Sequence, residues 1–93
     1  MWRSEVARYP WPVEEALTIM HCESRGNPLA RGDNGNSLGL MQLWRGWAPW
    51  YGVEAEALMD PATNIAVAYA VYEHRGHWGG AGGWSCADIN GIR

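Results

Sequence analysis

The chain has 93 residues and a formal net charge of −3, and it contains no run of basic residues, which argues against a nucleic-acid partner. Because 47% of its residues are hydrophobic, the composition excludes a disordered chain, and the length predicts a single domain over residues 1–93. No apolar stretch approaches the length of a membrane span, and residues 1–5 are too polar for a signal peptide.

The first predicted helix covers residues 12–23. Pro12 suits the first helical position, where its missing N–H group has no partner to lose, and Gly26 is the expected stop signal. Between them, apolar side chains recur at the spacing of one helix face, at Val13, Ala16, Leu17 and Met20.

The middle of the chain predicts a long loop. Residues 27–38 are turn formers almost throughout, with room for a small hairpin in residues 30–42, and long loops in compact domains are often functional. The apolar segment 38–50 predicts a short extended piece followed by a helical turn, and residues 54–58 predict a brief helix.

The second predicted helix runs from Pro61 to Arg75. Asp60 can cap its first turn, and Gly76 is expected to end it. Its buried face is expected at Ile65, Ala68, Tyr69 and Tyr72. The glycine-rich tail from His77 onward is expected to be irregular. These elements predict a mainly α fold.

The aromatic composition is unusual, with seven Trp, four Tyr and no Phe. Trp and Tyr combine a flat apolar face with a polar edge, which suits sugar rings, although we expect most of the tryptophans to fill the core. The only two cysteines, Cys22 and Cys86, are compatible either with one disulfide or with two buried thiols.

Glu23 closes the first predicted helix and precedes the polar loop. The negative end of the helix dipole disfavours its charged form, and apolar neighbours such as Met20 and the aromatic residues would add a desolvation effect of the same sign. Both effects raise the pKa of the carboxyl group, as a general acid working near neutral pH requires. The position alone also fits an ordinary solvated Glu at a helix end.

A metal site is not expected. His74 and His77 are three positions apart, but Gly76 is expected to end the helix between them, and the sequence has no Cys-x-x-Cys pair. The glycines of residues 79–83 follow a predicted helix instead of preceding one, which is the wrong order for a phosphate-binding loop. We therefore expect neither a metal nor a cofactor.

Three short motifs, in order, resemble those of the lytic transglycosylase family. Residues 22–28, Cys-Glu-Ser-Arg-Gly-Asn-Pro, resemble the segment around the family's catalytic Glu. Residues 39–42, Gly-Leu-Met-Gln, are similar to its second motif, and residues 60–65, Asp-Pro-Ala-Thr-Asn-Ile, to its third. The Cys before the Glu, with a late Trp-Ser-Cys, is similar to the resuscitation-promoting factors. The resemblance covers about residues 12–86, taken as the core of the domain.

The resemblance implies a small lysozyme-like α (α+β) fold with a substrate groove between helical parts. It implies cleavage of the β-1,4 bond between N-acetylmuramic acid and N-acetylglucosamine in peptidoglycan, with Glu23 as catalytic acid and then base and a 1,6-anhydro product. Gln42 would bind sugar or acetamido groups, and Ser24 would support the local backbone. Asn64 and Tyr69 would face the site, where they orient the Glu or contact substrate.

The resemblance also implies a disulfide between Cys22 and Cys86, peptidoglycan glycan strands as the partner, and a location outside the cell at the cell wall. Because the chain shows no signal peptide, we expect export through a removed leader, a larger protein or phage delivery. We expect the domain to act as a monomer.

This sequence lacks the Ala-Tyr-Asn-Ala-Gly motif of many transglycosylases and is shorter than most of them. A hydrolytic muramidase is therefore the alternative, in which Asp33 activates a water opposite Glu23; an inverting pair of this kind is about 6.5–9.5 Å apart. Asp33 also fits an ordinary turn. Two non-enzymatic alternatives are a peptidoglycan-binding module that uses Trp and Tyr platforms, and a small disulfide-held structural protein.

Overall fold

Two helices, α2 (Val13–Ser24) and α4 (Pro61–Arg75), are the longest elements of the computed structural model, which describes residues 2–93. Both predicted helices are confirmed to within one residue at each end. The other elements are short: helices α1 (Arg3–Val6), α3 (Trp47–Trp50) and α5 (Ser85–Ile89), 3₁₀ segments η1 (Asp33–Gly35) and η2 (Ala55–Met59), and strands β1 (Arg31–Gly32), β2 (Ser37–Leu38) and β3 (Leu43–Trp44). The fold is mainly α with a small sheet, as predicted.

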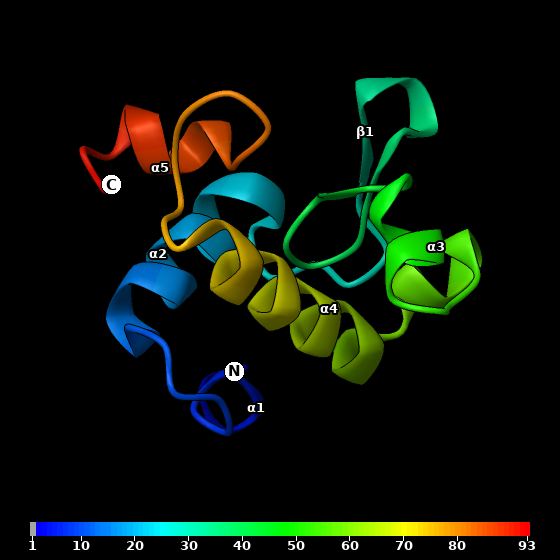
Figure 1. The fold of residues 1–93 in the computed structure, drawn as a ribbon, viewed down its shortest axis with the longest axis horizontal. Coiled ribbons are helices and arrows are strands. Elements are labelled where there is room, and N and C mark those ends of the chain that lie inside the picture. The colour runs from blue at the N-terminus through cyan, green and yellow to red at the C-terminus, as the bar shows by residue number, and fades with distance from the viewer. Residues whose placement is uncertain (1) are drawn as a thin grey trace.

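Helix α4 runs through the middle of the molecule (Figure 1). Helices α1, α2 and α5 lie on one side of it, whereas the sheet and α3 lie on the other. None of the helices within residues 2–93 is long and apolar enough to cross a membrane.

The first turn of α4 is capped as predicted, because the Asp60 carboxylate accepts a hydrogen bond from the backbone N–H of Thr63 at 3.0 Å. Gly76 ends the helix in the left-handed conformation, with φ 79°. Ile65 and Ala68 are buried as expected, but Tyr69 and Tyr72 are only half-buried.

Helix α2 ends at Ser24, because Arg25 already adopts the left-handed conformation with φ 57°. The buried Ser24 hydroxyl accepts a hydrogen bond from the N–H of Gly26 and donates one to the carbonyl of Met20. These bonds satisfy polar groups at the helix end, where the backbone ladder stops. Glu23 therefore lies in the last turn of a well-defined helix.

The three strands form one antiparallel sheet in the order β1-β2-β3. Arg31 pairs with Leu38 across the first two strands, and Leu38 pairs with Leu43 across the second and third. The first pair confirms the hairpin expected in residues 30–42. The third strand is the extended piece predicted within residues 38–50, and it pairs with the hairpin.

Asn64 connects α4 to this sheet from a fully buried position. Its side-chain oxygen accepts a hydrogen bond from the N–H of Met41 at 2.9 Å, and its nitrogen donates to the carbonyls of Leu38 and Leu58 at 2.9 and 2.8 Å. A buried polar group left without such a partner costs about 1–3 kcal/mol. Asn64 therefore fixes where the sheet sits relative to the central helix.

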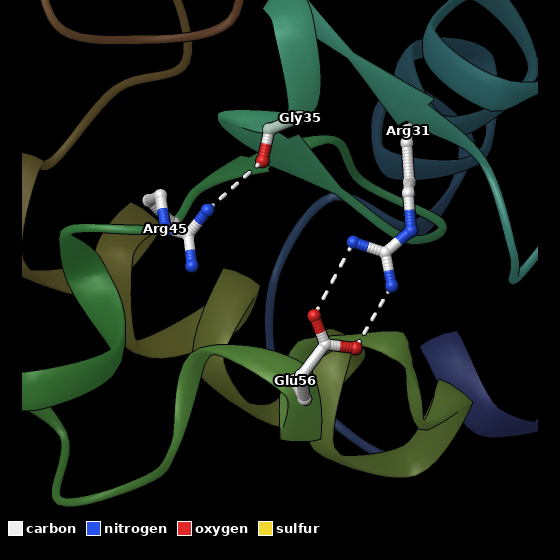
Figure 2. Close-up of polar contacts among 4 residues, drawn as sticks. All are labelled: Arg31, Gly35, Arg45 and Glu56. Atoms are coloured by element: carbon white, nitrogen blue, oxygen red, sulfur yellow. Dashed lines mark hydrogen bonds and ion pairs between the residues drawn. The ribbon is translucent and has the colours of Figure 1, made fainter.

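An exposed ion pair ties the sheet to η2 on the outside of the molecule (Figure 2). Arg31 of β1 donates to both carboxylate oxygens of Glu56 at 3.3 and 2.8 Å, while Arg45 donates to the carbonyl of Gly35 at 3.4 Å. The Arg31 guanidinium holds the pKa of Glu56 below its ordinary value. Because both partners are exposed, solvent screens the ion pair. It therefore contributes little to the stability of the fold and mainly orients β1 relative to η2.

The hydrophobic core extends beyond residues 12–86, since Val6 is fully buried and Ile92 packs against the core. Fewer tryptophans than expected are buried. Trp11, Trp78 and Trp84 are buried, Trp2 and Trp47 are half-buried, and Trp44 and Trp50 are exposed.

Two helices differ from the sequence prediction. Residues 3–6 form α1, for which no pattern was evident, and the tail expected to be irregular contains α5. Cys86 and Ala87 of α5 are buried, and Cys86 forms a disulfide with Cys22 of α2. The tail is therefore helical because a cross-link and a buried face hold it against α2, neither of which shows as a local sequence pattern.

The disulfide joins residues 64 positions apart, and the chain-entropy model assigns about 4 kcal/mol to closing a loop of that length. We predict that reduction, or the double substitution Cys22→Ala and Cys86→Ala, lowers the free energy of unfolding by about this amount. Urea denaturation with and without reductant measures it, with the double variant as a control for reductant effects. Coincident unfolding curves for the oxidised and reduced protein would contradict the prediction.

Candidate active site

A cavity of about 430 Å³ lies at the C-terminal end of α2, within the size range of small-molecule sites. One wall is the segment that precedes and opens α5, and the facing wall comes from the hairpin and the residues after it. The lining residues are Glu23, Asp33, Asn36, Ser37, Gln42, Leu43, Trp44, Trp47, Val71, Gly82, Gly83, Trp84 and Ser85.

Glu23 is a half-buried carboxyl group on the floor of this cavity. Burial raises its pKa above the ordinary value, and the negative charge of Asp33 raises it further. The backbone N–H of Cys86 donates a hydrogen bond to Glu23 Oε2 at 3.3 Å and opposes part of that shift. The result is a carboxyl group that holds its proton to higher pH than an exposed Glu.

Of the apolar neighbours expected around Glu23, aromatic residues do line its cavity, but Met20 does not. Met20 packs into the core and is not among the cavity residues. Leu43, Val71 and Trp84 line the cavity instead. They come from β3, α4 and the C-terminal segment, so the desolvation of Glu23 depends on tertiary packing.

Asp33 lines the same cavity as Glu23, although ten residues separate them in the chain. It opens η1 in the left-handed conformation, with φ 50°, and its carboxylate accepts a hydrogen bond from the Ser37 hydroxyl. The loop predicted from turn-forming residues thus carries its acidic side chain to the cavity.

Gln42 also lines the cavity and adopts the left-handed conformation, with φ 48°. Its side-chain nitrogen donates to the carbonyls of Ala30 and Gly39 at 3.0 Å each, which uses both of its N–H groups. A Cβ atom at Gly32 would lie 2.5 Å from Gln42 Oε1, so a larger residue there would require the Gln42 side chain to shift. The Gln42 amide therefore braces the hairpin, with its oxygen as the remaining polar atom.

Three other residues expected at the site lie outside the cavity lining. Ser24 closes α2, and Asn64 is buried between α4 and the sheet. Tyr69 stacks on Tyr9 with ring centres 5.1 Å apart and donates a hydrogen bond to Glu73, which raises the pKa of Tyr69. The structure thus brings together Glu23, Asp33 and Gln42 from the sequence-based set.

Arg75 holds the glycine-rich wall of the cavity, a role that the sequence analysis missed. Its guanidinium donates to the carbonyls of four residues in the following loop, His77, Trp78, Gly79 and Ala81, at 2.7–3.3 Å. A Cβ atom at Gly83 would lie 2.1 Å from Arg75 Nη1. Gly83 therefore allows this loop to pack closely against the Arg75 guanidinium while it lines the cavity.

Other cavity residues that sequence reasoning did not single out are Ser37, Trp44, Trp47 and Ser85. Trp44 and Trp47 lie shortly after the Gln42 motif, and the only signal for them in the sequence was the high tryptophan content, which suits a sugar-binding surface. Within residues 2–93, no group of three or more His, Cys, Asp or Glu side chains is arranged to hold a metal ion.

Residues 1–82 match the family model described as Transglycosylase SLT domain, which is most of the chain. The chain belongs to this family. Searches of curated proteins and of solved structures each found no match. The match to the transglycosylase SLT domain includes Glu23, Asp33 and Gln42, and it ends before Cys86, whose N–H group contacts Glu23.

Membership of the SLT family supports lytic transglycosylase-type activity in general and suggests peptidoglycan as the substrate. The Cys22–Cys86 disulfide in this SLT domain indicates an extracellular environment, because disulfides persist where conditions are oxidising.

The raised pKa of Glu23 makes a prediction about stability. The folded state binds this proton more tightly than the unfolded state, so stability falls as pH rises from the ordinary carboxyl pKa of 4.5 through the raised value. Glu23→Gln removes this loss, and its free energy of unfolding should exceed that of the parent at pH 7.5 by more than it does at pH 4.

Urea denaturation at the two pH values measures the difference. Glu14→Gln on the same helix is the matched control: Glu14 is exposed, and Arg3 lowers its pKa, so this substitution should act in the opposite direction. A Glu23→Gln variant that gains no stability at higher pH would show that burial does not disfavour the Glu23 charge.

Proposed function

We propose that this SLT domain cleaves the β-1,4 bond between N-acetylmuramic acid and N-acetylglucosamine in peptidoglycan, outside the cell at the cell wall. The proposal is supported mainly by one observation: Glu23, within the family match, is a partly desolvated carboxyl group with a raised pKa on a cavity that also has aromatic walls. Such a carboxyl group keeps its proton to higher pH than an exposed Glu, which suits it to act as a general acid.

In the first proposed step, protonated Glu23 donates its proton to the glycosidic oxygen. The bond between that oxygen and C1 of N-acetylmuramic acid breaks, and the N-acetylglucosamine side leaves with a free 4-hydroxyl group. Positive charge develops at C1 of the muramoyl ring, where the neighbouring acetamido group of the substrate can stabilise it. A second carboxylate is therefore not required for this step.

In the second step, the Glu23 carboxylate accepts the proton of the muramoyl 6-hydroxyl group while O6 bonds to C1. The product is a 1,6-anhydro sugar, no water is consumed, and Glu23 is again protonated for the next cycle. The N–H of Cys86 donates to Glu23 Oε2 and can stabilise the carboxylate between the two steps.

We assign the remaining residues by their contacts. Gln42 offers its side-chain oxygen to the substrate while its nitrogen braces the hairpin. Ser24 and Asn64 act as positioning residues, because they hold the end of α2 and the sheet. Tyr69 lies outside the cavity and is not assigned a substrate contact.

Hydrolysis is the second candidate, and the position of Asp33 favours it. A carboxylate on the same cavity as the general acid is the arrangement by which inverting glycosidases activate a water molecule. In that reaction the water oxygen bonds to C1 while Asp33 accepts a proton from the water, the glycosidic C1–O bond breaks, and Glu23 donates its proton to the leaving oxygen; the product has a reducing end.

We predict that Glu23→Gln lowers turnover of purified peptidoglycan at least about 100-fold, because one group supplies both proton transfers. Binding to peptidoglycan should persist, since Gln keeps the shape and the acceptor for the Cys86 N–H. Glu14→Gln is the control with unchanged activity. Retained activity in Glu23→Gln would reject Glu23 as the acid, and no activity in the parent protein would favour a pure binding module.

Asp33→Asn separates the two candidate reactions. For anhydro-product formation, the variant should remain active, but loss of the Asp33 charge lowers the pKa of Glu23. Because the general acid must be protonated, the fall of kcat/KM at high pH should then begin at a lower pH. Mass spectrometry should find muropeptides lighter by one water than reducing-end products. Reducing-end products from the parent, lost in Asp33→Asn, would establish hydrolysis instead.

A further inference from the structure

The tryptophans of this protein fall into two groups by what their indole N–H groups do. Trp2, Trp11, Trp78 and Trp84 each donate to a protein acceptor, at 2.8–2.9 Å. Trp44, Trp47 and Trp50 donate to no acceptor within residues 2–93. We call these three residues the tryptophan ridge. Because a buried indole N–H is normally paired, an unpaired one is suited to solvent or to a ligand.

The ridge is continuous along β3 and α3. The rings of Trp44 and Trp47 have centres 6.2 Å apart and planes at 81°, and those of Trp47 and Trp50 lie 5.5 Å apart at 75°. In each contact the edge of one ring meets the face of the next. Trp44 is 57% exposed and Trp50 is 64% exposed. An exposed apolar surface that is contiguous, unlike a scattered single side chain, indicates a binding surface.

One end of the ridge belongs to the Glu23 cavity, and the other end extends beyond it. Trp44 and Trp47 line the cavity, whereas Trp50 does not. Trp50 instead packs against His74 near the end of α4, with ring centres 5.4 Å apart. The His74 ring is exposed and makes no hydrogen bond to any residue from 2 to 93, so its nitrogens are free to bind hydroxyl or amide groups.

This combination suits a sugar ring. A pyranose presents an apolar C–H face, which packs on an indole, and a rim of hydroxyl groups, which hydrogen-bond to a neighbouring imidazole or indole N–H. A negatively charged polymer fits less well, because the chain has a net charge of −3 and Glu73 lies next to His74. The direct continuation from the cavity also favours the strand that the cavity holds over an unrelated partner.

We infer that Trp50 and His74 form an outlying sugar subsite that binds a neutral N-acetylhexosamine unit of the same glycan strand whose scissile bond lies at Glu23. This inference rests on the proposed function for the identity of the strand. The subsite makes affinity depend on strand length, because only a strand long enough to leave the cavity reaches Trp50.

The test measures binding without turnover. In the Glu23→Gln background, the dissociation constants of β-1,4-linked N-acetylglucosamine dimers and hexamers are determined by NMR titration, which also follows each indole N–H signal. Trp50→Ala should weaken hexamer binding about three- to tenfold and leave dimer binding unchanged. Trp50→Tyr should restore most of the affinity, because it keeps an aromatic face.

Ile89→Ala is the matched control, since Ile89 is an apolar side chain of α5 that is 75% exposed and lies outside the cavity. It should bind both oligomers like the parent. The Trp50 indole signal should shift with hexamer and not with dimer. Equal hexamer affinity in Trp50→Ala and the parent, or an unmoved Trp50 signal at saturation, would overturn the subsite.

Failure of the proposed function is read separately. If Glu23→Gln keeps full activity on peptidoglycan, Glu23 is not the acid. The subsite at Trp50 is then still tested by the NMR titration alone. Conversely, loss of activity in Glu23→Gln with length-independent binding supports the catalytic proposal and overturns the subsite.

Discussion

Cys22 and Cys86 are 64 residues apart in the chain, and their disulfide holds α5 against the end of α2, beside Glu23. The same contact brings the N–H of Cys86 to the Glu23 carboxylate and carries Trp84 and Ser85 to the cavity. In a chain this short the core alone supplies little stability, so the cross-link positions the C-terminal wall and also strengthens the fold. The cross-link therefore also determines the shape of the site.

The other walls of the cavity are held in place by polar side chains that hydrogen-bond to the backbone. Asn64 holds β2, the turn after it and η2 on α4 with three hydrogen bonds, Gln42 braces the hairpin, and Arg75 binds carbonyls of the glycine-rich loop. Each of these side chains hydrogen-bonds to backbone groups of a neighbouring segment and so ties that segment in place. Residues within the family motifs therefore act on Glu23 largely by shaping the cavity around it.

The tryptophans serve two different purposes in one small chain. Those whose indole N–H groups are paired anchor the core, as when Trp84 donates to the carbonyl of Met41 and Trp78 to Glu15. Those of the tryptophan ridge donate to no acceptor within residues 2–93, and two of them, Trp44 and Trp50, are exposed. Because a Trp residue buried in a core and one on the surface look alike in sequence, only the tertiary structure distinguishes them, through burial and hydrogen-bond partners.

The sequence by itself determined the two long helices, the hairpin loop and the ends of α4, because hydrophobic spacing and capping residues such as Asp60 and Gly76 act over a few neighbouring positions. It also led to Glu23, through the family motifs. Only the tertiary structure decided that Asp33 shares the cavity with Glu23 while Asn64 and Tyr69 do not line it, and that the tail forms α5. These outcomes depend on contacts between residues far apart in the chain, and the pattern of neighbouring residues carries no information about such contacts.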